Sequence, residues 1–264
     1  MPSIDVAGHR IAYEAYGDPQ QPLLVLVHGL NGDASTVAPL AARLAERFHV
    51  VTPDALGHGR SDHPASFTIE DQGRVLNALV AALGRSSATL AGISMGSYLV
   101  AQAAILEPAR TDRLVLVVSK AHGTTSSSAA FAARRGVDLA TLDPEAAMAL
   151  LAEALWSPDT PADRRAELLG SMAGEQVQLT PDEQARVERS LAGFDLRPGL
   201  GRVTAPAFVV SGASDGLNPP ELGRELADHL PHARFEVYEH SGHMLAYEET
   251  DRLVHDVLSF TAGD

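Results

Sequence analysis

Short runs of consecutive apolar residues alternate with longer segments of helical periodicity through most of this chain. A continuous apolar run such as 23–27 is typical of a strand covered on both faces, because a strand with one solvated face alternates apolar and polar positions. This run predicts a strand at 23–27, and short segments rich in β-branched and other apolar residues predict strands at 49–52, 88–91, 113–119, 207–210 and 234–238. The periodic segments predict helices at 35–47, 68–83, 98–106, 220–230 and 247–260. This alternation predicts an α/β fold with a mostly parallel, doubly wound sheet.

Residues 3–7 and 9–16 show a different pattern, in which apolar and polar positions alternate on either side of Gly8. A turn at Gly8 and a second one at Gly17-Asp18-Pro19 bound these segments. They predict two antiparallel strands at one edge of the sheet.

The alternation of strands with helices stops after residue 119 and resumes near residue 202. The residues between contain alanine-rich amphipathic segments at 127–135, 144–156, 161–172 and 181–191, and the pattern holds no strand-like run. The economical interpretation is an all-helical insertion at 120–201 in an α/β core domain made of 1–119 and 202–264.

Composition narrows the classes of protein that this chain can belong to. Its 264 residues are 45% hydrophobic, which suffices for one large core. The formal charge of −14, without a clustered basic stretch, argues against nucleic-acid binding. The absence of cysteine excludes a thiol nucleophile, a disulfide framework and a thiolate metal site. No apolar run approaches the roughly 20 residues that cross a bilayer, and no signal-peptide pattern opens the chain, so we expect no membrane association and a cytoplasmic protein.

The sequence Gly92-Ile93-Ser94-Met95-Gly96 lies between a predicted buried strand and a predicted helix that stops at Glu107-Pro108. A sharp strand-to-helix turn strains its central residue, and glycines two positions away remove side chains that would collide there. The turn exposes the Ser94 hydroxyl and points the Met95 backbone N–H toward the space before it. The alternative is a glycine-rich turn that happens to contain a serine.

Several chemically capable residues each follow a predicted strand. In a doubly wound parallel sheet, active groups gather beyond the carboxyl ends of the strands. We therefore expect five positions to meet at one edge of the sheet: His28-Gly29, Asp54, Ser94, Asp215 and His243.

Four blocks carry a resemblance that covers nearly the whole chain: His28-Gly29-Leu30-Asn31-Gly32, 54–62, Gly92 to Gly96, and Ser241-Gly242-His243. With these blocks in this order, the chain resembles the α/β-hydrolase superfamily, in its lidded, serine-nucleophile branch of esterases and enol-lactonases. The resemblance implies a catalytic triad in the chain order nucleophile, acid, histidine, which corresponds to Ser94, Asp215 and His243.

Each triad position has a competitor. His240 is the nearest rival of His243, but the glycine that frees the backbone adjoins His243. Some family members place the acid after the strand that follows the nucleophile helix, where Ser119-Lys120-Ala121-His122 supplies no carboxylate. The chain departs from the family at Asn218, which precedes Pro219-Pro220 where an apolar residue is common.

The resemblance also implies an oxyanion hole and a lid. The backbone N–H groups of Leu30 and Met95 would bind the oxyanion. The insertion at 120–201 matches the family's lid, which covers the nucleophile and shapes the substrate pocket. His122, at the lid entrance, and Phe131 and Trp156 are candidate pocket residues, although aromatic residues at helical spacing more often form the core of the lid itself.

The stretch 54–62 contains two aspartates and a histidine, but we reject a metal site there. Its glycines suit a tight loop packed beneath the site, and its charged groups are more naturally satisfied by one another and by backbone. Gly57-His58-Gly59 lacks the glycine spacing and following helix of a dinucleotide loop. We therefore expect no metal and no cofactor.

These features favour a serine hydrolase that cleaves a small-molecule carboxylic ester or lactone. Two alternatives use the same triad, namely hydrolysis of a carbon–carbon bond in a dicarbonyl and acyl transfer to an acceptor other than water. A further alternative is a non-catalytic small-molecule receptor that keeps the triad. A serine at the nucleophile position disfavours the aspartate-dependent dehalogenase and epoxide-hydrolase branches.

Overall fold

The structure is a computed structural model that describes residues 1–124, 126–172 and 176–263. Eight strands form one sheet in the spatial order β1-β2-β4-β3-β5-β6-β7-β8. The strands are β1 (Ser3–Val6), β2 (His9–Tyr16), β3 (Leu23–Val27), β4 (His49–Pro53), β5 (Ala88–Ile93), β6 (Thr111–Val117), β7 (Ala207–Gly212) and β8 (Ala233–Tyr238). β1 and β2 pair antiparallel at one edge, and every pairing from β4 onward in that order is parallel. The predicted doubly wound fold is confirmed.

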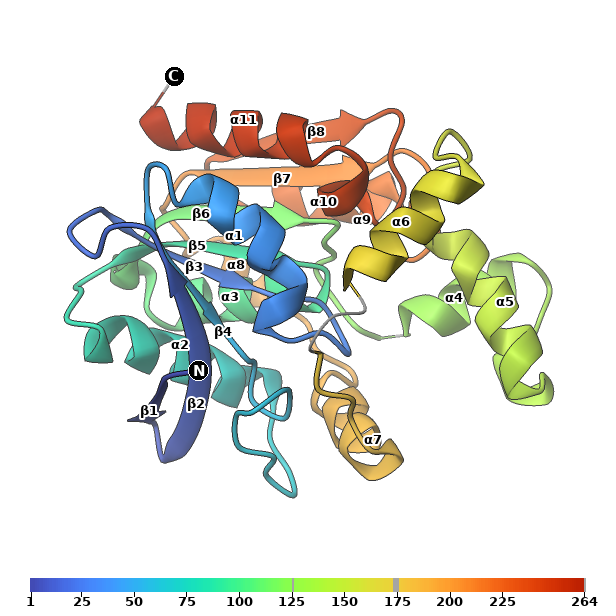
Figure 1. The fold of residues 1–264 in the computed structure, drawn as a ribbon, viewed down its shortest axis with the longest axis horizontal. Coiled ribbons are helices and arrows are strands. Elements are labelled where there is room, and N and C mark those ends of the chain that lie inside the picture. Colours follow the sequence, from blue (N-terminus) through green and yellow to red (C-terminus); the bar gives the residue numbers. More distant parts are fainter. Residues whose placement is uncertain (125, 173–175, 264) are drawn as a thin grey trace.

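Helices cover both faces of this sheet (Figure 1). One face packs against α2 (Ile69–Ala82), α3 (Met95–Leu106) and α9 (Pro220–Asp228), and the other against α1 (Ala38–Leu44) and α11 (Thr250–Ala262). The continuous apolar run at 23–27 is β3, which is covered on both faces. Val25 and Val27 lie in the core on one face, whereas Leu24 and Leu26 lie in the core on the other.

Two predicted helices are each divided in the structure. The segment 35–47 forms a 3₁₀ turn, η1 (Ala34–Val37), and then α1, because Pro39 has no N–H to donate to an earlier carbonyl and its ring crowds the preceding turn. The segment 247–260 forms α10 (Leu245–Glu248) and α11, with Glu249 between them at φ −126°. The predicted helix 68–83 is α2, and it begins with a capping box between Thr68 and Asp71.

Between β6 and β7, the residues that the structure describes form helices joined by loops, with one isolated β-bridge between His122 and Asp195. These helices are α4 (Ser127–Arg134), η3 (Leu139–Thr141), α5 (Pro144–Leu155), α6 (Ala162–Met172), α7 (Pro181–Ser190) and α8 (Arg197–Leu200). A separate short 3₁₀ turn, η2 (Pro108–Arg110), lies before β6. Within 120–201, residues 125 and 173–175 lie outside the described residues. Figure 1 shows α4, α5 and α6 beyond the arrowheads of β6 and β7, at the edge where the strand-end loops meet.

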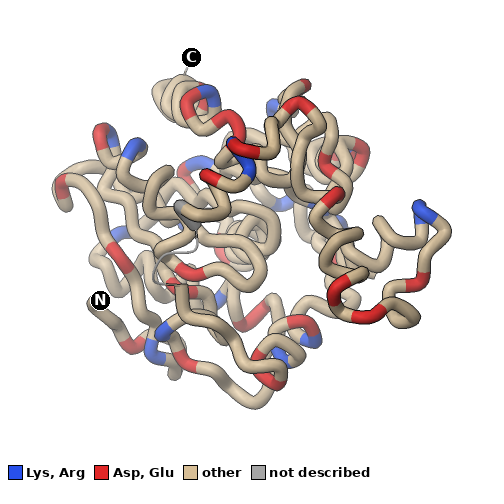
Figure 2. The backbone as a smooth tube through the Cα atoms, turned by 45° about the vertical axis from the view of Figure 1, so that its right-hand side comes forward, with Lys and Arg blue, Asp and Glu red and all other residues tan. Residues whose placement is uncertain are grey.

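Charged residues are interspersed along the chain. In the described part, Figure 2 shows basic positions scattered among acidic ones over both the sheet domain and the helical segment. None of the described helices combines the length and the apolar character that crossing a membrane requires.

Candidate active site

Ser94 lies at the junction of β5 and α3 in a strained backbone conformation. Its φ of 51° and ψ of −117° are unusual for a residue with a side chain, and such positions cost about 1–3 kcal/mol when the surrounding fold enforces them. A hydrogen bond from the Ser94 backbone N–H to the Val117 carbonyl, 2.9 Å, ties the turn to the neighbouring strand. The strained turn leaves the Ser94 side chain partly exposed at the carboxyl edge of the sheet.

The two flanking glycines are required by close backbone approach. A Cβ on Gly96 would lie 2.2 Å from the Val27 carbonyl oxygen, and one on Gly92 would lie 2.3 Å from the Gly96 carbonyl group. Both distances are shorter than the 3.0 Å below which Cβ contacts are essentially never seen, and the neighbouring atoms belong to the backbone, which cannot move without disturbing the sheet. The Gly-x-Ser-x-Gly pattern therefore follows from the tightness of this strand-to-helix turn.

Three side chains from separate loops form one line of hydrogen bonds. His243 Nε2 lies 2.9 Å from Ser94 Oγ. On the opposite side of the ring, His243 Nδ1 lies 2.8 Å from Asp215 Oδ2 and 3.0 Å from Oδ1. A ring that donates from Nδ1 to the carboxylate presents the Nε2 lone pair to the serine hydroxyl. The Asp215 side chain is fully buried and that of His243 is 9% exposed.

Backbone donors hold the Asp215 carboxylate in place. Its Oδ1 accepts the N–H groups of Leu217 and Asn218, each at 2.8 Å, in the loop that follows β7. These bonds fix the carboxylate from behind while its other oxygen faces the imidazole. The rival histidine, His240, is exposed and pairs with Asp159 at 2.7 Å, which raises the pKa of His240. It therefore lies in a surface ion pair.

The loop after β3 passes directly in front of Ser94. A Cβ on Gly29 would lie 3.7 Å from the Ser94 Cβ, so the backbone leading into Leu30 borders the serine. Met95 is the first residue of α3, and the first N–H groups of a helix have no acceptor within it. The two amides predicted to form an oxyanion hole thus belong to segments that flank Ser94.

His28 holds this loop through its ring nitrogens. Nδ1 bonds the Gly29 carbonyl at 2.8 Å, and Nε2 accepts the Ala55 N–H at 3.0 Å. Burial lowers the pKa of His28, which fits a neutral ring with one donor and one acceptor. Further along the loop, the buried Asp33 carboxylate accepts the Val177 N–H at 2.8 Å, which joins this loop to the helical segment.

In the stretch 54–62, backbone donors from within the stretch and from the loop after β3 satisfy the Asp54 carboxylate. Asp54 is fully buried, and its two oxygens accept the backbone N–H groups of Ala34 at 2.8 Å and Arg60 at 2.7 Å. Gly59 lies so close that a Cβ there would be 2.2 Å from the Asp54 carboxylate. Burial lowers the pKa of the nearby His58 to about 3, so this ring is neutral at physiological pH. Among the described residues, no group of three or more His, Asp or Glu is arranged to hold a metal ion.

The three candidate pocket residues have different surroundings. Phe131 of α4 is buried against Gly216, which follows the acid, and Trp156 is buried with its backbone against Gly242, which precedes the histidine. His122 faces elsewhere, because its ring contacts Glu225 of α9 at 3.5 Å and Thr124 at 3.1 Å. The structure thus brings Phe131 and Trp156 to the loops that carry Asp215 and His243 but gives His122 a different set of partners.

A polar network beside Asp215 was not predicted. It joins Asn218, whose Nδ2 donates to the Tyr98 hydroxyl at 2.6 Å and the Val118 carbonyl at 2.7 Å, to Ser127, whose hydroxyl donates to Asn218 Oδ1 at 2.7 Å. Lys120 Nζ in turn donates to Ser127 Oγ at 2.9 Å. Burial raises the pKa of Tyr98, and the nearby Asp215 adds to the rise. The one signal in the sequence was the polar residue at 218.

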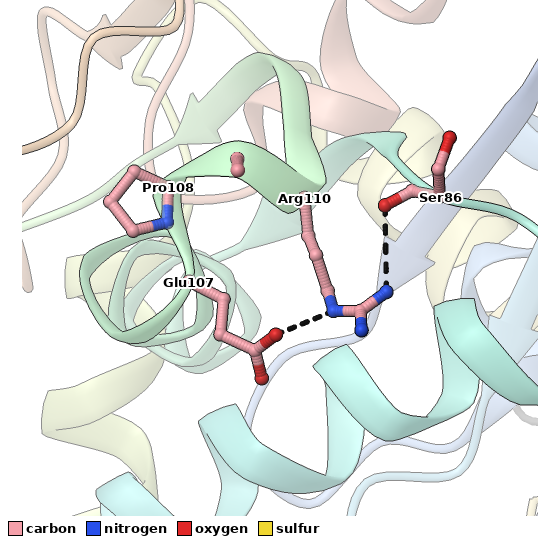
Figure 3. A pocket seen from close by; sticks show the side chains of 5 residues that line it. Ser86, Glu107, Pro108 and Arg110 are labelled. Atoms are coloured by element: carbon pink, nitrogen blue, oxygen red, sulfur yellow. Dashed lines mark hydrogen bonds and ion pairs between the residues drawn. The ribbon is translucent and has the colours of Figure 1, made fainter.

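A hollow of about 530 Å³ lies at the end of the sheet domain opposite to Ser94 (Figure 3). It is lined by Ser86 and residues 107–110, where Arg110 donates to the Glu107 carboxylate at 2.5 Å. These residues precede β5 and β6, so the hollow lies at the amino ends of the strands. It is therefore remote from the edge that carries Ser94.

Comparisons with known proteins identify the family of the chain. The family model for the alpha/beta hydrolase fold matches residues 22–250. A 3-oxoadipate enol-lactonase of Acinetobacter baylyi is 28% identical, with 93% of this chain and 90% of the relative covered. A candidate carbamate hydrolase of Variovorax paradoxus is 30% identical, with 95% of both chains covered.

Among solved structures, an enol-lactonase from Burkholderia xenovorans LB400 superposes with a TM-score of 0.84 at 26% identity, covering 99% of this chain and all of that one. The fold, the strained serine turn and the sequence matches lead to one assignment. The chain belongs to the alpha/beta hydrolase fold family, in the branch that resembles esterases and enol-lactonases, and is a hydrolase.

Proposed function

We propose that the protein is a serine hydrolase that cleaves a carboxylic ester or lactone through an acyl-enzyme on Ser94. One observation carries the proposal: the line of hydrogen bonds from the Ser94 hydroxyl through His243 to Asp215, with steps of 2.9 Å and 2.8 Å. A serine hydroxyl is a weak nucleophile near neutral pH unless a base takes its proton during attack. The ring of His243 lies within reach of that proton.

In the first half-reaction, Ser94 Oγ forms a bond to the substrate carbonyl carbon while its proton passes to His243 Nε2. The carbonyl oxygen becomes an oxyanion that the N–H groups of Leu30 and Met95 bind, each contributing about 3 kcal/mol of transition-state stabilisation. The bond to the leaving oxygen then breaks, and His243 returns its proton to that alkoxide. For a lactone, the alkoxide stays attached to the acyl group.

In the second half-reaction, a water molecule gives a proton to His243 and attacks the acyl carbon. The Ser94 oxygen leaves and takes that proton, which releases the carboxylic acid and restores the enzyme. Asp215 does not exchange protons in either half. It holds the imidazole with Nδ1 protonated and stabilises the imidazolium, a role that its two backbone donors support.

We further propose that 120–201 is a lid over the site, inserted in a core domain of 1–119 and 202–264. Contacts of the described residues support this. The Gly216 N–H donates to the Ala154 carbonyl at 2.9 Å, and the Met244 N–H donates to the Leu155 carbonyl at 3.0 Å. The end of α5 therefore adjoins both the acid loop and the histidine loop, where it can shape a small-molecule pocket.

The test is Ser94→Ala assayed with p-nitrophenyl butyrate, a butyrolactone and a p-nitrophenyl carbamate, with products identified by mass. We expect turnover of the ester or the lactone by the wild type, and a loss on the order of 10⁴-fold in kcat in the variant. Near-normal ester turnover by Ser94→Ala would remove Ser94 from the mechanism. Turnover confined to the carbamate would move the substrate class away from esters and lactones.

A further inference from the structure

Glu248, the last residue of α10, bonds two segments that flank the candidate site. Its Oε2 accepts the backbone N–H of Gly242 at 2.6 Å, and Gly242 immediately precedes His243. Its Oε1 accepts the Ser157 N–H at 2.8 Å and the Thr160 hydroxyl at 2.5 Å, both from the helical segment. One carboxylate thus joins the histidine loop to residues 155–160, here called the docking segment.

The docking segment also contacts the histidine loop directly. The Met244 N–H donates to the Leu155 carbonyl at 3.0 Å, on the far side of His243 from Gly242. A Cβ on Gly242 would lie 2.6 Å from that same Leu155 carbonyl oxygen, so the two backbones touch with no side chain between them. The residues on both sides of His243 are therefore bonded, one to Glu248 and one to the docking segment.

The residues that donate hydrogen bonds to Glu248 are buried. Ser157 is fully buried, Thr160 is 8% exposed and Gly242 is buried. When a buried donor loses its acceptor, the cost of removing the donor from water remains without a hydrogen bond to offset it. Hydrogen bonds to a carboxylate are also stronger than those between two neutral groups. Glu248 stands at the end of α10, directly before the break at Glu249 that separates α10 from α11.

We propose that Glu248 is a positioning residue, which holds the loop of His243 so that the imidazole stays within hydrogen-bond reach of Ser94. It acts through the Gly242 backbone and touches no reacting atom. The proposal rests on the proposed role of His243 as general base. The bond from Thr160 fastens the docking segment to the same carboxylate, so this side of the helical segment is fixed relative to the histidine.

Four variants separate the two arms of the carboxylate. Glu248→Ala removes both arms. Glu248→Gln keeps the shape but has one acceptor oxygen, so its NH₂ group must face a donor on one side. Thr160→Val removes only the bond from the Thr160 hydroxyl to Glu248 and leaves the Ser157 N–H in place. The matched control is Asp159→Asn, which breaks the exposed Asp159–His240 ion pair at the same junction without touching Glu248.

Active sites are first titrated with a fluorophosphonate, so that kcat is expressed per reactive site. Deuterium exchange of the peptide spanning 239–247 is then measured by mass spectrometry. We expect Glu248→Ala to lose about 100-fold in kcat per titrated site, with KM changed less than about threefold, because a small misplacement of a catalytic group costs about that much. Glu248→Gln recovers part of the loss, at about tenfold below wild type. Thr160→Val and Asp159→Asn stay within about threefold.

Exchange of the 239–247 peptide should be faster in both Glu248 variants and unchanged in Asp159→Asn. A purely structural role would lower the titrated fraction and leave kcat per site intact, which would overturn the proposal. So would a loss in Thr160→Val as large as that in Glu248→Ala, or unchanged exchange in the Glu248 variants. If the wild type neither hydrolyses esters nor reacts with the probe, the proposed function fails, and the exchange comparison alone decides whether Glu248 orders the loop.

Discussion

Replacing Asn218 with leucine tests whether the polar network supports the acid loop. Leucine has a similar size and is the kind of residue that the family often places there. The substitution keeps the backbone N–H that donates to Asp215, but it removes three side-chain bonds, to Tyr98, Val118 and Ser127. The perturbation therefore acts on the network and leaves the direct donors of the carboxylate in place.

The expected magnitude follows from the groups that the substitution leaves behind. The buried Val118 carbonyl loses its side-chain donor, which costs about 1–3 kcal/mol, whereas the buried Tyr98 hydroxyl loses one bond and keeps Ser94 and Ser127 as partners. With about 1 kcal/mol for the lost Tyr98 bond, the loss in the free energy of unfolding is about 2–4 kcal/mol. For a chain of this length, each kcal/mol corresponds to roughly 2–4 °C in Tm, so a fall of about 10 °C is the central expectation.

Thermal unfolding of wild type, Asn218→Leu, Ser127→Ala and the double variant measures this directly. Ser127→Ala removes one donor to Asn218 and should cost about 1 kcal/mol. Because both residues belong to one network, the double variant should lose less than the sum of the single losses. Tm of Asn218→Leu within 2 °C or so of wild type, or strictly additive losses, would refute the reasoning.

Three further predictions concern other residues. Gly96→Ala should lose at least about 100-fold in kcat/KM, because its Cβ would overlap the Val27 carbonyl at 2.2 Å; Gly170→Ala in α6, with open space around it, is the control and should change nothing. Burial lowers the pKa of Lys120 from 10.5 to about 8, so between these pH values the unfolded state binds more protons and this residue's contribution to stability rises with pH. Urea unfolding measured below pH 8 and up to pH 10.5 should show Lys120→Met gaining most over wild type below pH 8, and a pH-independent difference would contradict the assignment. His240→Ala should keep kcat within about twofold in the ester assay, since it removes only an exposed ion pair, and a large loss would reopen the choice of catalytic histidine.

The sheet was predictable because its strands are buried on both faces. Apolar runs without alternation identified β3 to β7, and the rule that parallel strands direct their following loops to one edge predicted where Ser94, Asp215 and His243 would lie. The predicted helix 35–47 was wrong in its continuity, although Pro39 was visible in the sequence. The division of the last helix had no such marker in the sequence; Glu248 and Glu249, at the break, accept hydrogen bonds from Gly242 and Ser241 of the histidine loop.

The support around the triad could not be predicted for a different reason. Tyr98, Lys120, Ser127 and Asn218 come from four separate segments, and each has a common structural role when it is considered alone. Only tertiary packing reveals that they form one network. The contacts of Phe131, Trp156 and His122 likewise depend on how the helices after β6 pack, which the periodicity of the sequence does not specify.

The most direct test of the account is to stop the wild-type enzyme with acid during turnover of p-nitrophenyl butyrate and to map the acyl group by mass spectrometry. The account predicts a butyryl group on the peptide that contains Ser94, which is absent in Ser94→Ala and strongly reduced in His243→Ala, because the serine then has no base to take its proton. Efficient turnover with a butyryl group on another side chain, or turnover in which Ser94 is never acylated, would contradict it.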